Sequence, residues 1–150
     1  MKLLVDTCAW SLLLRRKNKT AMNDDEQLML TSLTEAIQDG RVAIIGPIRQ
    51  EVLSGIKEAA QFDKLRSALE PFQDEQLTTL YYEEAARLFN LCRSRGVECG
   101  STDILVCAVA VRKHWAILTS DGGLQRCMEV FPFARQRDTS PATTSTCAVS

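Results

Sequence analysis

Short runs rich in apolar or β-branched residues alternate with longer segments in which apolar residues recur every three or four positions. The short runs predict buried strands, and the longer segments predict amphipathic helices. We expect strands over residues 3–5, 42–45, 76–80, 116–119 and, as an edge strand, 130–133. We expect helices over residues 7–14, 24–39, 47–55, 57–69, 83–95, 104–113 and 122–128.

Strands that alternate with helices along the chain are typical of an α/β domain with a largely parallel sheet. The predicted strands are nearly all apolar, as expected when helices cover both faces of the sheet. The pattern therefore predicts an α/β/α sandwich with a central, mostly parallel sheet. Residues 1–137 form one domain in this interpretation, and the small polar residues 138–150 are predicted to be a disordered tail.

Composition and charge narrow the class of protein only slightly. The chain is 45% hydrophobic and 25% charged, with a net charge of −1, which is ordinary for a globular domain and neither favours nor excludes a polyanionic partner. Asp6 and Arg15 interrupt the apolar N-terminal stretch, so a secretory signal is disfavoured. The apolar run 104–111 is far shorter than the roughly 20 residues of a membrane span. We expect a soluble cytoplasmic protein.

The six cysteines show no C-x-x-C spacing, and His114 is the only histidine, so a structural zinc site is disfavoured. Without a secretory signal, we expect free thiols in a reducing cytoplasm. The lone histidine also leaves no Cys–His or Ser–His pair for nucleophilic catalysis. His114 lies in a basic helix end, R-K-H-W, where it suits the helix C-terminus or solvent better than a role as a base.

Four acidic residues share one place in the predicted fold. Asp6 follows the first strand, and Glu51 lies in the first turns of the helix after the second strand. Asp103 stands at the start of the apolar helix, and Asp121 follows the strand over residues 116–119. Strand C-termini and helix N-termini meet at one edge of a parallel sheet, where open α/β sheets bind ligands. We therefore expect the four carboxylates on one rim.

Capping is the alternative role for three of these acids. Aspartate is a favoured N-cap, worth about 1 kcal/mol over alanine, so Asp6, Asp103 and Asp121 each have this second interpretation. Glu51 does not, because a glutamate past the first turn caps nothing. Taken together, two carboxylates about 4 Å apart repel by roughly 4 kcal/mol at an effective dielectric near 20. Mg²⁺ or Mn²⁺, which prefer oxygen ligands, would offset this repulsion and support phosphoryl transfer to water.

Basic residues near the predicted site are candidates for RNA phosphate contacts. A cluster just past the first helix consists of Arg15, Arg16, Lys17 and Lys19. Arg49 lies within one helical turn of Glu51 and is a further candidate. Phosphate contacts of this kind provide affinity without sequence information. The alternative interpretation is a solvated basic face.

Four segments resemble the successive motifs of PIN domains, most closely those of VapC-type ribonuclease toxins. They are L-L-V-D-T-C-A-W, R-Q-E-V-L-S-G, S-T-D-I-L-V-C-A-V-A and A-I-L-T-S-D, and the resemblance extends over residues 2–133. It implies a metal-dependent endoribonuclease whose Asp6, Glu51, Asp103 and Asp121 ligate Mg²⁺ or Mn²⁺, directly or through water. Thr7 matches the small hydroxyl residue after the first aspartate. The resemblance also implies a homodimer that a cognate antitoxin inhibits by occupying the active-site groove.

The sequence departs from the family pattern after its last acid. The family often has T-x-D-x-D-F there. In this chain Gly123 and Leu124 stand at the positions of the second aspartate and the phenylalanine, which disfavours tight binding of a second metal ion. A haloacid-dehalogenase-like phosphatase is disfavoured, because that family needs an aspartate at position 8, where Cys8 stands. A catalytically silent PIN-like module that binds RNA or a protein remains the alternative, and a cleavage assay separates the two.

Overall fold

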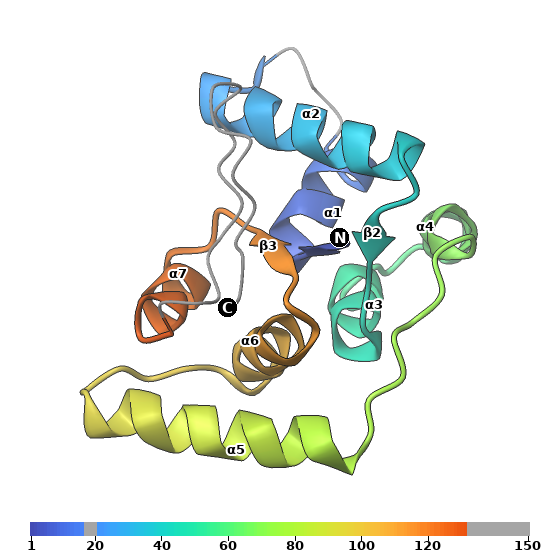
Figure 1. Ribbon diagram of the computed structural model, residues 1–150. Coiled ribbons are helices and arrows are strands. Elements are labelled where there is room, and N and C mark those ends of the chain that lie inside the picture. Colours follow the sequence, from blue (N-terminus) through green and yellow to red (C-terminus); the bar gives the residue numbers. More distant parts are fainter. Residues whose placement is uncertain (17–20, 132–150) are drawn as a thin grey trace.

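The computed structural model describes residues 1–16 and 21–131. Within these residues, three short strands form one parallel sheet in the order β2-β1-β3 (Figure 1). The strands are β1 (Leu3–Val5), β2 (Val42–Ala43) and β3 (Ala116–Leu118). Leu3 pairs with Val42 on one side and with Ala116 on the other, so the central strand is the first in the chain. The predicted α/β fold is confirmed.

Helices connect the strands and cover the sheet (Figure 1). In chain order they are α1 (Thr7–Leu14), α2 (Asp24–Gln38), α3 (Gly46–Leu53), α4 (Ala59–Leu69), α5 (Thr79–Ser94), α6 (Ser101–Lys113) and α7 (Gly122–Glu129). α1 packs against α2 and α3, while α6 packs against both α5 and α7. Each connection between neighbouring parallel strands therefore passes through helices, as parallel pairing requires.

The core consists of the strands and the apolar faces of the helices around them. All residues of β1 and β3 are buried, and α6 contributes a continuous buried stretch from Val106 to Ala110. Trp10 of α1 is fully buried and packs edge-to-face on Phe72, with 5.0 Å between the ring centroids. Trp10 is therefore a core residue, and the rigid core holds the strand ends at fixed positions.

Two predicted strands are wrong. Residues 76–78 form no strand, and Thr79 already begins α5, with Thr78 as its N-cap. The chain pairs with the sheet only slightly earlier, through one isolated bridge between Ile44 and Asp74 and a hydrogen bond from the Glu75 N–H to the Ile44 carbonyl at 2.8 Å. Threonine suits strands and helix caps alike, and here tertiary packing selected the cap.

The predicted edge strand after α7 is also absent from the part of it that the structure describes. The N–H groups of Val130 and Phe131 bond back to the carbonyls of Cys127 and Met128, which closes the last helical turn instead of adding to the sheet. Residues 132–133 lie outside the described residues, as do the predicted tail 138–150 and the basic residues Lys17 and Lys19. None of the helices in the described ranges is long and apolar enough to cross a membrane.

The prediction that all cysteines are free thiols is wrong for one pair. Cys99 and Cys127 form a disulfide, while Cys8, Cys92 and Cys107 are free. Cys147 lies outside the described residues. The paired cysteines are 28 positions apart and meet because α7 packs against α6. Spacing along the chain does not reveal such a pairing, because it depends on which helices pack together.

Candidate metal centre

The ends of β1 and β3 bring Asp6 and the segment from Thr119 to Asp121 to the same edge of the sheet. The Asp6 N–H donates to the Leu118 carbonyl at 3.0 Å, which continues the strand pairing to the last residue before the rim. The parallel register places the residues that follow each strand side by side. The topology therefore fixes two of the predicted acids, Asp6 and Asp121, on one rim.

Asp6 occupies the N-cap position of α1, but its side chain makes no capping hydrogen bond. The carboxylate is buried, at 5% exposure, and Oδ2 accepts a hydrogen bond from Thr119 Oγ1 at 2.7 Å. The Cys8 thiol lies 3.7 Å from the same oxygen. A buried carboxylate costs free energy unless it is paired, and capping does not account for this one.

Asp103 lies in the first turn of α6, whose N-cap is Gly100, so Asp103 does not cap the helix either. Burial, followed by the negative charges of Asp6, Asp121 and Glu51, raises the pKa of Asp103 from 3.8 to about 6. The four predicted acids are thus close enough to raise the pKa of one member of the set. The negative charges of the other three acids therefore disfavour ionisation of Asp103, in addition to its burial.

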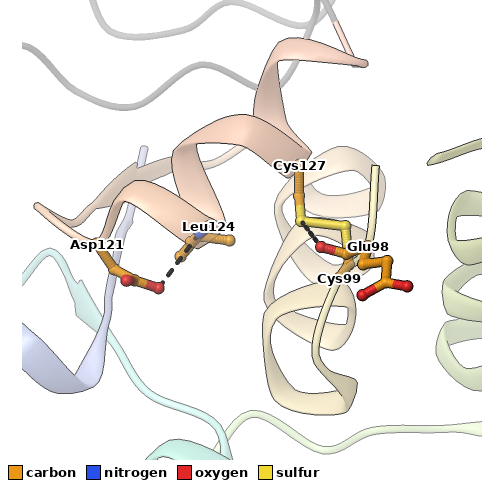
Figure 2. The surroundings of a disulfide bond; sticks show 5 residues. All are labelled: Glu98, Cys99, Asp121, Leu124 and Cys127. Carbon is orange, nitrogen blue, oxygen red and sulfur yellow. Dashed lines mark hydrogen bonds between the residues drawn. A yellow bond between two sulfur atoms is a disulfide. The ribbon is translucent and has the colours of Figure 1, made fainter. Parts of the chain in front are cut away.

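The remaining two acids lie at the open side of the rim. Asp121 is exposed and caps α7, because its Oδ2 accepts from the Leu124 N–H at 3.2 Å (Figure 2). The capping interpretation is therefore correct for Asp121, in addition to its charge beside Asp103. Glu51 of α3 is exposed, and its Oε1 accepts from the Thr7 hydroxyl at 3.4 Å.

Thr119 directly follows β3 and has a role at the rim that its place in a predicted strand did not indicate. It is fully buried, donates to Asp6 Oδ2, and accepts from the Asp121 N–H at 3.0 Å. One hydroxyl therefore orients one acid and fixes the backbone of another. A hydroxyl residue that ends a strand two positions before an aspartate is the signal that would have identified it.

Replacing Thr119 with valine is expected to lower the free energy of unfolding by about 1–2 kcal/mol, because the buried Asp6 oxygen and the Asp121 N–H each lose a partner. Divalent-ion affinity should fall by roughly 10- to 100-fold, as is usual when a group that orients a ligand is removed. Chemical denaturation and Mn²⁺ titration measure the two effects. Thr119→Ser keeps the hydroxyl and should retain both properties, so equal losses in the serine and valine variants would contradict the orienting role.

The disulfide joins the two segments that carry Asp103 and Asp121. Cys99 precedes α6, and Cys127 lies in α7, on the helix that Asp121 caps (Figure 2). Cys127 is fully buried, and Cys99 is 8% exposed. The crosslink therefore limits how far the start of α6 can separate from α7, and so how far two of the acids can separate from each other.

The donor set at the rim is suited to a hard divalent cation. Its potential ligands are carboxylate oxygens, which Mg²⁺ and Mn²⁺ prefer. Burial raises the pKa of Asp103, and repulsion from the other three carboxylates raises it further. Within residues 1–16 and 21–131, no group of three or more His, Cys, Asp or Glu side chains is positioned tightly enough to enclose an ion by itself. The chemistry of the residues fits a metal, and bound water would have to complete the ligand shell.

The three arginines predicted to contact RNA differ in how many hydrogen bonds their side chains already make within the protein. Arg49 donates from Nε to Asp74 Oδ1 at 2.9 Å, from Nη1 to the Leu69 carbonyl at 3.1 Å, and from Nη2 to the Phe72 carbonyl. All of its nitrogens thus stabilise the connection that follows α4. Arg15 is exposed, and Arg16 pairs with Glu26 at 2.7 Å.

The chain matches one protein family and is similar in fold to a solved structure. The family model described as PIN domain matches residues 3–128. The solved structure titled FitAcB from Neisseria gonorrhoeae is similar to this chain, with a TM-score of 0.67 at 18% sequence identity. That match covers 90% of this chain and 96% of the other. No curated protein sequence matches closely enough to count as a relative.

Proposed function

Because this chain belongs to the PIN domain family, whose members are typically nucleases, we propose that it is a metal-dependent endoribonuclease that hydrolyses RNA phosphodiester bonds. The observation that carries the proposal is the set of acids around the half-buried Asp103. Burial raises the pKa of Asp103, and the negative charges of Asp6, Asp121 and Glu51 raise it further. These acids follow strand ends or lie in the first turns of helices, the positions at which α/β folds bind ligands.

The four carboxylates would hold Mg²⁺ or Mn²⁺, with Asp6 and Asp103 on the buried side and Glu51 and Asp121 on the exposed side. A divalent cation at such a site lowers the pKa of water and offsets charge that develops on phosphate oxygens. Thr119 holds Asp6 in place, and the Leu124 N–H does the same for Asp121. The exposed side leaves room for a phosphodiester, which must reach the site from solvent.

In this proposal, Arg15 and Arg16 contact RNA, and Arg15 does so at a phosphate. Both follow α1, whose first residue is adjacent to Asp6, and neither side chain is buried. A phosphate contact gives salt-dependent affinity without base specificity. Arg49 is left out, because each nitrogen of its guanidinium already donates to Asp74 or to a backbone carbonyl.

We further propose that the nuclease is the toxin of a toxin–antitoxin pair, acts in the cytoplasm, and forms a homodimer that a cognate antitoxin inhibits. This part of the proposal follows from the resemblance of the four sequence motifs to VapC-type toxins. Residues 1–137 would be the nuclease domain and residues 138–150 a tail. A purified antitoxin that abolishes RNA cleavage and co-elutes with the protein would support the toxin assignment.

The proposed activity is tested by incubating the purified protein with total cellular RNA in Mg²⁺ or Mn²⁺, beside a sample in EDTA. We expect discrete fragments with either metal and intact RNA in EDTA, because the carboxylates alone cannot offset phosphate charge. Folding in each sample is checked by circular dichroism. If the folded protein binds Mn²⁺ and RNA but leaves every RNA intact, the silent binding module would replace the nuclease.

A further inference from the structure

A cleft of about 500 Å³ opens beside the carboxylate rim, between α1, the first turns of α2 and the segment after β3. Its lining includes Cys8, Ser11, Glu26 and Ser120. It adjoins a second cleft of about 590 Å³, which shares Glu26 and Ser120. The volume falls within the roughly 300–1,000 Å³ of small-molecule sites.

The cleft has an apolar base and a polar rim. Leu12 and Met29 line it and are almost fully buried, at 6% and 4% exposure, so they provide an aliphatic and thioether surface. Ser11, Glu26 and Ser120 add hydroxyl and carboxylate groups at the rim. A flat heterocycle with polar edges matches this division, because its faces are apolar and its edges carry donors and acceptors.

The cleft is next to the place where phosphodiester hydrolysis is proposed. Cys8 lines the cleft, and its thiol lies 3.7 Å from Asp6 Oδ2. Ser120 lines it as well and stands between Thr119 and Asp121 in the chain. A nucleotide whose phosphate lies at the carboxylates therefore has a side-chain-lined cavity within reach of its base.

Glu26 is the most strongly positioned polar group in this cleft. Its Oε1 accepts from the Asn23 N–H at 3.2 Å in a capping box, and its Oε2 accepts from Arg16 Nη1 at 2.7 Å. The Asn23 N–H and Arg16 lower the pKa of Glu26, so the carboxylate is ionised at neutral pH. Each oxygen keeps a free acceptor position, since a carboxylate can accept about four hydrogen bonds.

We propose that this cleft binds a guanine base of the RNA substrate, with Glu26 accepting from its N1–H and N2–H groups and Arg16 donating to its O6. Guanine is the base that presents two adjacent donors beside an acceptor, which complements a carboxylate next to a guanidinium. Adenine, cytosine and uracil lack the paired donors. The proposal rests on the proposed function, because it assigns the base next to the phosphate that the carboxylates hold.

The test uses nucleotide binding without catalysis. Wild-type protein in EDTA is titrated with GMP, AMP, CMP and UMP, and backbone amide shifts are followed by NMR. We expect GMP to bind at least about tenfold more tightly than the other nucleotides, because one bidentate hydrogen-bonded pair provides about that much discrimination. The amide shifts should change at Ser11, Met29 and Ser120. Glu26→Gln should remove this preference while α2 stays capped, because glutamine also serves in a capping box.

The matched control is Asp24→Asn, which removes the same charge from the same helical turn but does not line either cleft. It should keep the GMP preference. Equal binding of all four nucleotides, no binding at all, or a preference that survives Glu26→Gln would overturn the guanine site. Sequencing the ends of cleaved RNA separates the two proposals. Guanine-selective binding without any cleavage overturns the nuclease alone, and cleavage without guanine preference overturns the guanine site alone.

Discussion

Replacing Asp103 with asparagine is expected to abolish RNA cleavage and, at the same time, to make the metal-free protein more stable. Activity should fall by at least about a hundredfold, because removing even a group that only orients a metal ligand costs 10- to 100-fold. Stability should rise because Asp103 is held ionised in a half-buried position and among like charges. The raised pKa records the free energy that the folded state loses when this carboxyl ionises.

The size of the stability effect depends on pH. The pKa of Asp103 is about 6 in the folded protein and 3.8 without the fold's influence. Folding therefore favours the protonated carboxyl. Its favourable contribution is fully present below the unfolded pKa and is lost as pH rises through 6. Asparagine stays neutral throughout, so the two proteins should be equally stable near pH 3 and diverge between pH 4 and 6.

The expected difference at pH 7 is about 1 kcal/mol after allowance for solvent screening of a half-buried group, or about 2–4 °C in the melting temperature. Mn²⁺ should raise the melting temperature of the wild type and leave that of Asp103→Asn unchanged. Thermal melts with and without Mn²⁺, at several pH values, measure both effects. Asp63→Asn removes an exposed carboxylate on α4 and should behave as the wild type. A variant that keeps cleavage, or that is less stable without metal, would show that Asp103 is not at the centre of the site.

Breaking the disulfide is expected to lower the free energy of unfolding by about 3.5 kcal/mol. The bond closes a loop between residues 28 positions apart, and in the chain-entropy model a loop of this size stabilises the protein by about that amount. The melting temperature should fall by about 7–14 °C. The double variant Cys99→Ser/Cys127→Ser should match the reduced wild type, since both lack the crosslink.

Thermal melts with and without dithiothreitol measure this effect. Addition of the reductant should destabilise the wild type and leave the double variant unchanged, which controls for other actions of the thiol. Mn²⁺ affinity should also fall in the double variant, because the start of α6 and the start of α7 are then no longer tied together. A wild type whose stability is insensitive to reduction would contradict a structural disulfide between Cys99 and Cys127.

Much of the fold follows from the spacing of apolar residues within short segments of the chain. The apolar runs around Leu3–Val5 and Ala116–Leu118 became the two buried strands at the centre and one edge of the sheet, and the amphipathic segments became helices close to their predicted bounds. A strand or helix depends mainly on residues within a few positions of one another, so periodicity reveals it. One exception is the run 76–80, where threonines suited a strand and a helix start equally and which became mostly loop and helix. The other is the predicted edge strand after α7, whose described residues close the helix instead.

The candidate site was predictable as a set of acids, because the ends of parallel strands share an edge whatever the details of packing. The role of each acid was not predictable. Asp6 and Asp121 both occupy N-cap positions, yet only the Asp121 side chain makes the capping bond. Local sequence allows both outcomes, and the tertiary contact between Thr119 and Asp6, 113 positions apart, decides between them.

By itself, the sequence determined the three strands that form the sheet and the helices between them, because these depend on spacing along the chain. The tertiary structure alone decided the pairing of Cys99 with Cys127, the commitment of Arg49 to backbone carbonyls, and the burial that raises the pKa of Asp103. These features join residues that only packing brings within reach of one another. Their energies depend on distances of a few ångströms, which no pattern along the chain contains.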